Sequence, residues 1–573
     1  MSLVAQAPRR GARRRRLSRV VALLVLGCSA MPTTTPPPID PEAPRAWVEA
    51  EYTSPPGRVI SVAAGQSLQA ALDAARPGDV IKLQAGATFE GPFRLPRKPG
   101  HGWIVVRTSV GDDRLPPPGT RVSPAQADPM PKLVAAAGAV VTAAPGAHHY
   151  RFIGLEIRPA SGVFLHNLVQ LGTTEIEVDA LPHHIVVDRC YLHGDPLKGA
   201  RRGVAMNAGH VAVIDSYLAD FKEVGADSQA IAGWAGPGPF KIVNNYLEGA
   251  GENVLFGGGD PSILNLVPSD IEIRRNHFTK PLSWKVDEAS YAGTPWTVKN
   301  LLELKNARRV LVEGNVFEHN WVQAQNGFAI LFTVRNQDGR APWSVVEDVQ
   351  FTSNVVRHTA GGFNILGEDD IHPSQRTKRI RIENNLFAHV GDARWGGQGT
   401  LFQLLRGARD VVIEHNTALQ AGTLILVEGS PLRSFAYRHN IALGGGYGVV
   451  GTGTAPGLPT LRRFFPGALV EGNIIVGGDP SQYPPGARHV STLEAVGFVN
   501  PALDRYELAE ASAYKRAGAD GRDPGADFER LQRALGGAGG LAAIDAAVAQ
   551  AARDERSQRP TSAGERAWRH SPK

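Results

Sequence analysis

Short apolar alternations separated by polar corners recur along most of the chain. In the stretch 300–321, Leu302 and Leu304 alternate with polar residues, a polar corner follows, and Val310 and Val312 begin the next alternation. Alternation with a period of two predicts strands with one face in a core and one face in water. The polar corners predict tight turns between these strands. We interpret the stretch as most of one coil of a larger repeat.

An asparagine followed by two mostly apolar residues marks each repeat. Eight such asparagines occur at intervals of about 24 to 40 residues, namely Asn245, Asn276, Asn315, Asn354, Asn385, Asn416, Asn440 and Asn473. A β-rich unit of this period predicts a stacked solenoid, because no single unit can bury its own apolar face. Asparagine tolerates left-handed backbone angles and its amide both donates and accepts, so an internal ladder of amides is expected. Cys190 and Ser216 align with Asn245 and are predicted to occupy the same rung position.

A short helix is predicted before the first strand. Ser67 is a residue type that favours helix N-caps, and the apolar Leu68, Ala71 and Leu72 after it share one helical face. A Pro-Gly-Asp sequence at 77–79 ends the helix, and an apolar strand begins directly after it. The helix is expected to cover the open end of the solenoid, where unpaired strand edges would otherwise be exposed.

The repeats from about residue 148 to 475 resemble the right-handed parallel β-helix of the pectate lyase-like superfamily. The segment from Ser67 to Phe89 is similar to the opening of β-helix polysaccharide lyases of the chondroitinase B and alginate lyase kind. This resemblance implies an all-β fold, a right-handed parallel β-helix solenoid over residues 58–525. An N-terminal capping helix and a C-terminal helix at 526–553 complete the prediction, and residues 554–573 are predicted to be disordered.

The N-terminus has the pattern of a secretory signal. Four arginines at 13–16 precede an apolar core at 20–27 that is too short to span a bilayer, so residues 1–28 are predicted to be a signal peptide. Val25-Leu26-Gly27-Cys28 resembles a bacterial lipobox, which implies lipidation of Cys28 and a membrane lipoprotein. Leu26 is larger than the usual residue before the glycine, so free secretion is the alternative. Residues 29–57 are predicted to be a Pro-rich tether.

Composition narrows the range of partners. The formal net charge is +6, and the leader alone contributes seven arginines, so the rest of the chain gives no reason to expect a nucleic acid partner. With Cys28 lipidated, Cys190 is the one remaining cysteine, and no disulfide is expected. The protein is expected to be an extracytoplasmic monomer whose only membrane contact is the lipid anchor.

Outward positions of equivalent strands align from coil to coil in a solenoid, so scattered polar residues can form one stripe. Aligning the strands after the asparagine corners places Glu303, Lys305, Asn364 and Gln403 on one outer face. The residues predicted to extend this face or its rim are Gln229, Asn253, Arg335 and Arg406. The long insertions at 281–298, 336–348 and 368–377 are predicted to be loops that wall this face.

The resemblance implies a chemistry for this stripe, the β-elimination of uronic-acid polysaccharides. That reaction needs a base, a donor for the leaving oxygen, and a cation that neutralises the sugar carboxylate. We expect Lys305 as base with Glu303 and Arg335 as further catalytic residues, and Asp227 and Glu252 as candidate Ca²⁺ ligands together with Glu303. Gln229, Asn253, Asn364, Gln403 and Arg406 are the candidate polysaccharide-binding residues.

Several alternatives stay open at this point. Lys305 and Glu303 also fit a solvated turn with a cross-strand ion pair, because most charged clusters are of that kind. The loop tryptophans, Trp284, Trp296, Trp321, Trp343 and Trp395, fit either sugar stacking or buried packing. The histidine pairs at 148–149 and 183–184 favour stacking over a metal site. The chain is thus predicted to process an extracellular polysaccharide, with a lyase first, and a glycoside hydrolase or a non-catalytic carbohydrate-binding or surface-structural protein as alternatives.

Overall fold

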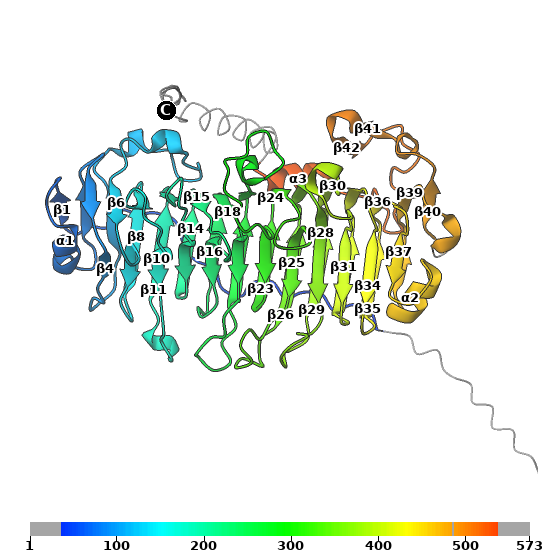
Figure 1. Ribbon diagram of the computed structural model, residues 1–573, viewed down its shortest axis with the longest axis horizontal. Coiled ribbons are helices and arrows are strands. Elements are labelled where there is room, and N and C mark those ends of the chain that lie inside the picture. Colours follow the sequence, from blue (N-terminus) through cyan, green and yellow to red (C-terminus); the bar gives the residue numbers. More distant parts are fainter. Residues whose placement is uncertain (1–35, 484–485, 537–573) are drawn as a thin grey trace, which may run out of the picture. The chain divides into compact units, whose positions relative to one another are not determined.

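Three long parallel sheets build almost the whole described structure. The computed structural model describes residues 36–483 and 486–536. Sheet A has 14 strands, sheet B has 14 and sheet C has 12, and successive strands of the chain visit A, B and C in turn (Figure 1). Each strand pairs in parallel with the equivalent strand one coil away. The predicted all-β fold, a parallel β-helix, is confirmed.

The strand bounds follow the repeat. Sheet A contains β1 (Val59–Val62), β2 (Val80–Leu83), β5 (Ile104–Thr108), β8 (His148–Ile153), β11 (His183–Asp188), β14 (Gly209–Ile214), β17 (Phe240–Val243), β20 (Ser269–Arg274), β23 (Ala307–Glu313), β26 (Val346–Thr352), β29 (Lys378–Glu383), β32 (Arg409–Glu414), β35 (Arg433–Arg438) and β38 (Leu469–Glu471). Sheet B contains β3 (Thr88–Glu90), β6 (Lys132–Ala135), β9 (Glu156–Pro159), β12 (Tyr191–His193), β15 (Tyr217–Phe221), β18 (Tyr246–Gly249), β21 (His277–Thr279), β24 (Val316–Asn320), β27 (Val355–Thr359), β30 (Leu386–Val390), β33 (Thr417–Gln420), β36 (Ile441–Leu443), β39 (Ile474–Val476) and β40 (Arg488–Val490). Sheet C contains β4 (Phe93–Leu95), β7 (Val141–Ala143), β10 (Asn167–Leu171), β13 (Arg202–Met206), β16 (Gln229–Gly233), β19 (Glu252–Phe256), β22 (Leu302–Leu304), β25 (Phe328–Thr333), β28 (Gly361–Leu366), β31 (Phe402–Leu405), β34 (Ile425–Glu428) and β37 (Val449–Gly451).

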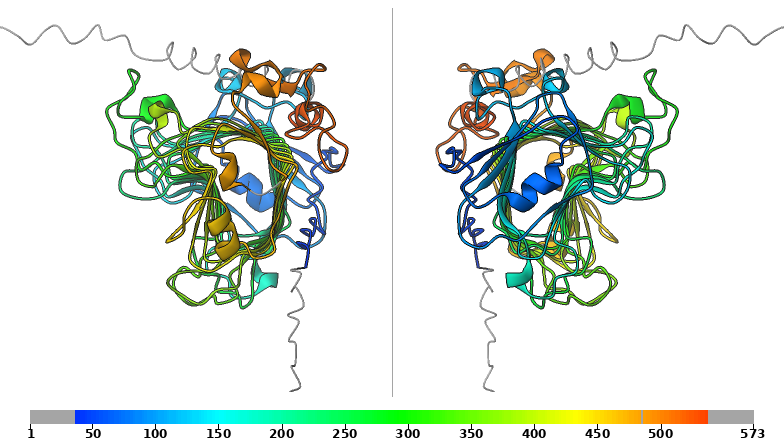
Figure 2. Two further views of the ribbon diagram at one scale, coloured as in Figure 1. Left: turned by 90° about the vertical axis from the view of Figure 1, so that its right-hand side faces the viewer. Right: turned by 90° about the vertical axis from the view of Figure 1, so that its left-hand side faces the viewer.

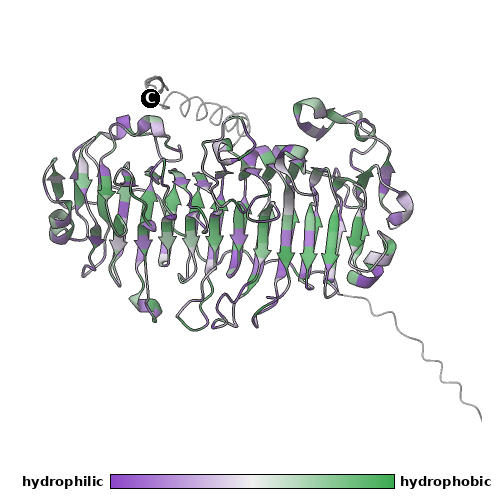
Figure 3. Cartoon of the chain, in the orientation of Figure 1, coloured by the Kyte–Doolittle hydropathy of each residue, from purple (hydrophilic) through white to green (hydrophobic). Residues whose placement is uncertain are grey.

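One continuous apolar core fills the space enclosed by the sheets. Leu302 and Leu304 of β22 stack on Ile330 and Phe332 of β25, and all four are fully buried. Figure 3 shows the alternation of hydrophobic and hydrophilic residues along these strands. Each coil buries its inward row against the next, which is why no single coil could fold alone.

The predicted asparagine ladder runs along the corner between sheets A and B. Asn276 donates from its backbone N and from Nδ2 to Oδ1 of Asn315 at 2.9 and 3.0 Å, and its Nδ2 also donates to the carbonyl of Ile242 at 2.8 Å. The pattern continues to Asn473, and Cys190 and Ser216 occupy the first rungs. These bonds satisfy buried amides that would otherwise cost about 1 to 3 kcal/mol each.

The left-handed residue of each corner is not the ladder asparagine but the residue before it. Ser353, Asn384, His415 and His439 have φ values of 55°, 58°, 49° and 56°. The expectation that the ladder asparagines themselves take left-handed angles is therefore wrong. Their inward amides are selected by hydrogen bonding, whereas the preceding residue turns its side chain outward.

Helices lie at the ends and flank of the solenoid (Figure 2). Helix α1 (Leu68–Ala74) is capped by Ser67, whose Oγ accepts from the N–H of Ala70 at 3.1 Å, and it buries Leu68, Ala71 and Leu72 as predicted. Helix α2 (Leu458–Phe464) packs near the last coils. Helix α3 (Phe528–Ala534) begins within the predicted 526–553 helix, and residues 537–573 lie outside the described residues.

A short antiparallel pair precedes α3. It consists of β41 (Phe498–Asn500) and β42 (Arg505–Leu508).

Among the described residues no helix is both long and apolar enough to cross a membrane.

Residues 36–52, here called the strap, lie along the outer face of sheet A in the direction opposite to coil order. The backbone N–H groups of Ile39, Glu42 and Arg45 donate to the carboxylates of Asp410, Asp348 and Asp270 at 3.3, 3.0 and 2.8 Å. Three residues of extended chain cover roughly 9 to 10 Å, which equals about two coil spacings. The described part of the predicted Pro-rich tether is therefore bound to the solenoid at regular intervals.

Candidate functional site

The outer face of sheet C carries the predicted polar stripe. Strand pairing places one register row through Leu255, Glu303, Leu331, Asn364 and Gln403, so Glu303, Asn364 and Gln403 share a face. Leu331 lies between Glu303 and Asn364 in this row. The polar stripe is therefore divided into two parts, separated by about two coil spacings or roughly 10 Å.

The first part is a group of charged side chains in and directly beside β16, β19 and β22. We call Asp227, Glu252, Lys299, Glu303 and Lys305 the sheet C cluster. Lys299 Nζ lies 2.5 Å from Asp227 Oδ2 and 3.7 Å from Glu252 Oε1, and Lys305 Nζ lies 3.7 Å from Glu303 Oε1. Sequence reasoning missed Lys299, because it lies in the irregular segment before β22 where no periodicity assigns a direction.

Neighbouring polar groups fix two of the carboxylates. Glu303 accepts from Thr333 Oγ1 at 3.0 Å and from Asn300 Nδ2 at 3.1 Å. Glu252 accepts from Gln229 Nε2 at 2.7 Å, and Gln229 Oε1 in turn accepts from Arg202 Nε at 2.9 Å. Gln229 is thus a buried positioning group for Glu252.

Glu252 is the most perturbed acid of the cluster. It is fully buried, and burial together with the carboxylates of Asp227 and Glu303 raises its pKa to about 7, while Lys299 and Lys305 oppose the shift. Burial opposes the charge of Lys299, but Glu252 and Asp227 outweigh it and raise the pKa of Lys299. A carboxyl that titrates near neutrality on the outer face of a sheet is a feature of functional sites.

A second buried lysine, Lys280, lies directly behind the cluster. Its Nζ donates to an oxygen cage that includes Asn253 Oδ1 at 3.1 Å and the carbonyls of Gly249 at 2.5 Å and Asn300 at 2.9 Å. Burial lowers the pKa of Lys280 to about 7, against the effect of the nearby Glu252. No sequence signal marks this residue, since it begins the long insertion after β21.

Asn253 does not lie on the outer face. Its Nδ2 donates inward to the carbonyls of Leu247 and Thr279 at 2.6 and 2.8 Å, and the side chain is fully buried. The substrate-binding prediction for Asn253 is wrong, because alternation is broken at the start of β19. The backbone N–H groups of Asn253 and Val254 both donate to the carbonyl of Leu301, and both side chains are buried.

The two predicted rim arginines differ in availability. Arg335 is paired with Asp369 at 2.6 Å and also with Asp370. Burial opposes its charge, but these carboxylates raise the pKa of Arg335. Arg335 is therefore engaged by its own loop, whereas Arg406 is exposed and has a left-handed backbone with a φ of 52°.

The cluster fits Ca²⁺ poorly as it stands. Asp227, Glu252 and Glu303 supply oxygen atoms, but the ammonium of Lys299 lies against two of these carboxylates, and that of Lys305 lies near the third. Two lysines thus supply the positive charge that the metal would supply. The calcium prediction stays a prediction, and no step below depends on it.

The remaining sequence features are structural. Trp284, Trp296, Trp321 and Trp395 form a buried cluster, so the packing alternative holds for them. Trp343 is half-buried and donates from Nε1 to the carbonyl of Leu266 at 3.0 Å. The acidic side chains at 368–370 pair with Arg376 and Arg335.

The chain was compared with known protein families, curated proteins and solved structures. No family model and no curated protein matches the sequence. A PL6 family alginate lyase is similar at 13% identity with a TM-score of 0.46, over 81% of this chain and 58% of that chain. A GH87 alpha-1,3-glucanase from Streptomyces thermodiastaticus is similar at 12% identity with a TM-score of 0.45, over 78% of this chain and 72% of that chain. A mannuronic acid specific polysaccharide family 6 lyase from human gut microbiota is similar at 12% identity with a TM-score of 0.41, over 76% of this chain and 83% of that chain.

These similarities concern the fold. The chain spans 58% of the length of the first of these structures, and identities of 12 to 13% say nothing of shared side chains. The three parallel sheets define the class directly: the chain is a parallel β-helix protein.

Proposed function

We propose that the protein binds an extracytoplasmic polysaccharide along the outer face of sheet C and cleaves it at the sheet C cluster. The observation that carries the proposal is the packing of Asp227, Glu252 and Glu303 against two lysines on an outward face, with the Glu252 pKa raised to about 7. Structural ion pairs elsewhere on the solenoid hold their acids in the ionised form, so a carboxyl near neutrality is the exception.

The reaction that fits these groups best is β-elimination of a uronic-acid polysaccharide. Lys299 lies where its positive charge can accept a sugar carboxylate, and Lys305, in its neutral form, is our candidate base for the adjacent proton. Asn364 and Gln403, farther along the row, are amides suited to sugar hydroxyls. Arg335 is assigned no role while Asp369 holds it.

The test is a panel of polyuronates incubated with the protein, with and without Ca²⁺, in which the absorbance of the unsaturated product is followed. Glu303→Gln and Lys305→Met should each lower the rate about 100-fold or more. The matched control is Lys241→Met on sheet A, where Lys241 also lies near a buried glutamate, at 3.5 Å from Glu272. Equal rates for Lys305→Met and the wild type would reject the proposed site.

A non-catalytic carbohydrate-binding protein is the second candidate. Two observations favour it, namely the engagement of Arg335 by Asp369 and the interruption of the polar row by Leu331. Binding of a polyuronate without product absorbance and without sugar release would support it. Sugar release without that absorbance would instead indicate a glycoside hydrolase.

The proposed location follows from the leader, which lies outside the described residues. We propose cleavage before Cys28 and a lipid anchor at that residue, with the solenoid as a monomer outside the cytoplasm. Cys28→Ser should release the protein from the membrane fraction while secretion continues. The same distribution between the membrane fraction and the medium for the wild type and Cys28→Ser would favour the freely secreted alternative.

A further inference from the structure

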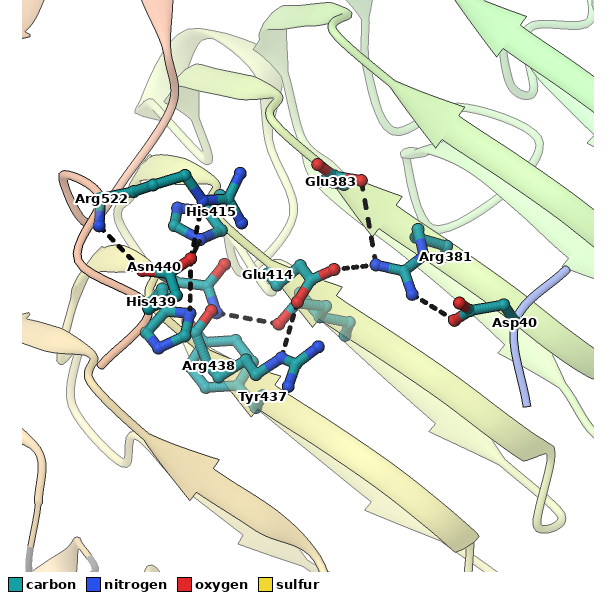
Figure 4. Close-up of polar contacts among 12 residues, drawn as sticks. Asp40, Arg381, Glu383, Glu414, His415, Tyr437, Arg438, His439, Asn440 and Arg522 are labelled. Carbon is teal, nitrogen blue, oxygen red and sulfur yellow. Dashed lines mark hydrogen bonds and ion pairs between the residues drawn. The ribbon is translucent and has the colours of Figure 1, made fainter. Parts of the chain in front are cut away.

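The segment 517–527, here called the closing segment, returns to the corner between sheets A and B. The N–H of Gly525 donates to the carbonyl of His439 at 2.8 Å, and the N–H of Ala526 donates to Thr417 Oγ1 at 3.0 Å. The N–H of Asp527 donates to Asn384 Oδ1 at 2.6 Å. These bonds bring Asp520 against two histidines of the solenoid (Figure 4 shows the two histidines side by side with Arg522).

The two histidines occupy equivalent places in successive coils. His415 and His439 directly precede the ladder residues Asn416 and Asn440, and Asn416 donates to Asn440 Oδ1 at 3.0 Å. The left-handed backbone before each ladder asparagine directs the imidazoles outward, and their ring centroids lie 4.9 Å apart. The ladder therefore fixes the spacing of the two rings.

The two ring nitrogens of His415 face a backbone carbonyl and a carboxylate. Its Nδ1 lies 3.2 Å from the carbonyl of Asp523, and a carbonyl only accepts, so Nδ1 carries the proton. Its Nε2 lies 2.9 Å from Asp520 Oδ2. In the doubly protonated ring this atom donates to the carboxylate, and in the neutral ring with its proton at Nδ1 it offers a lone pair that can bind a metal ion beside Asp520.

His439 is buried without a hydrogen-bond partner. Its side chain is 5% exposed, and neither ring nitrogen has a hydrogen-bond partner among the described residues. Its Nδ1 lies 3.9 Å from Asp520 Oδ2. One ligand atom from each of His415, His439 and Asp520 falls within a set whose members lie within 4.8 Å of one another.

We propose that His415, His439 and Asp520 bind one divalent transition-metal ion, in the first place Zn²⁺, which fastens the closing segment to the solenoid. Two imidazoles and one carboxylate are a ligand set typical of Zn²⁺, whereas Ca²⁺ and Mg²⁺ prefer oxygen ligands alone. Asp523 and Arg522 complete the surroundings: the Asp523 carbonyl orients His415, and Arg522 Nε donates to Asp520 Oδ2 at 2.7 Å.

A second histidine group offers a matched control. His149, His183 and His184 also bring ligand atoms close together. One ring nitrogen of each, however, already has a partner, because Nδ1 of His183 lies 2.7 Å from Nδ1 of His184, and Nδ1 of His149 lies 2.9 Å from Nδ1 of His148. The rings of His149 and His184 also stack at 4.5 Å. This group is explained by stacking and pairing without a metal.

The experiment uses the full chain produced without a histidine tag, stripped with EDTA and dialysed against ZnCl₂. We expect one Zn²⁺ per chain by elemental analysis, and a tetrahedral absorption spectrum when Co²⁺ replaces Zn²⁺. His439→Gln and Asp520→Asn should lose both, whereas the double variant His183→Gln, His184→Gln should keep both. Circular dichroism of each variant separates loss of the ion from loss of the fold.

A second readout follows the closing segment itself. At a Zn²⁺ concentration 100 times its Kd, limited proteolysis within residues 517–527 should slow about 100-fold, because the open segment becomes rarer by that factor. The proposal is overturned if the wild type holds no Zn²⁺ and shows no protection. It is equally overturned if folded His439→Gln retains the ion, or if only the variant at 183 and 184 loses it.

Discussion

The outer faces of sheets A and C both carry charged side chains stacked at the coil spacing, but the charges are arranged differently. On sheet A, acids and bases alternate from coil to coil through Asp270, Arg309, Asp348, Arg379 and Asp410. Arg309 pairs with Asp270 at 2.7 Å, and Arg379 pairs with Asp348 at 2.5 Å. The carboxylates of Asp270, Asp348 and Asp410 also accept hydrogen bonds from the backbone N–H groups of the strap.

On sheet C the acids are next to one another. Burial, together with Asp227 and Glu303, raises the pKa of Glu252. On sheet A the ion pairs with Arg309 and Arg379 outweigh burial and lower the pKa values of Asp270 and Asp348. The ionised form of the acids is therefore stabilised on sheet A, where Asp270 and Asp348 meet arginines, and destabilised at Glu252 on sheet C. Alternation of sign pairs each acid with a base on sheet A, whereas the sheet C cluster, where acids adjoin, is the site that we propose for a ligand.

The substitution with the largest expected effect on stability is Asp348→Ala on sheet A. The side chain is buried, and its loss leaves Arg379 without that carboxylate and Glu42 without an acceptor for its N–H. We expect a loss of about 3 kcal/mol in the free energy of unfolding, measured by urea titration. Asp338→Ala, which removes an exposed partner of Arg340, should change it by less than about 0.5 kcal/mol. Equal effects of the two variants would remove the distinction.

The next test is Glu252→Gln on sheet C. The native carboxyl titrates near 7 and the unfolded one near 4.5, so the native state holds the proton more tightly between these values. The free energy of unfolding of the wild type should therefore fall by about 2 to 3 kcal/mol as pH rises from 4.5 to 7. The variant should lack this fall and be the more stable protein at pH 8. Parallel pH profiles for wild type and variant would contradict the assignment.

The smallest expected effect belongs to the strap. Glu42→Pro keeps the extended backbone but removes the N–H that donates to Asp348, and should cost about 1.5 to 2 kcal/mol in the same urea titration. Ala43→Pro is the control, because no hydrogen bond from its N–H occurs in the described structure and the residue is exposed. A larger loss for Ala43→Pro than for Glu42→Pro would show that the strap is held by something other than this bond.

The repeat could be predicted from the sequence because the asparagine corner and the apolar alternation recur in each coil. Asn315 and Asn354 stack since the polar corner recurs with the apolar alternation, and that alternation also fixes Glu303 and Gln403 on one face. Alternation fails where a strand begins, and there it misplaced Asn253. It also gives no information on loops, which is why the capture of Arg335 by Asp369 could not be predicted.

The buried lysines are the other limit of the sequence. Lys280 is held by carbonyl oxygens of residues 20 to 31 positions away, and such a cage exists only after the coils have stacked. Lys299 lies in an irregular segment and meets Asp227 across 72 residues. Neither contact follows a periodic pattern, although Lys299 opposes the rise in the pKa of Glu252, and Glu252 opposes the fall in the pKa of Lys280.

The reversed course of the strap also sets an order of assembly. Ile39 leaves the ribosome long before Asp410, its partner 371 residues later, so the earliest part of the strap waits for nearly the last coil. Coils can add to one another locally, but the strap can dock along its whole length only on a finished row of aspartates. A fully docked strap therefore requires that the coils from β20 to β32 have already formed.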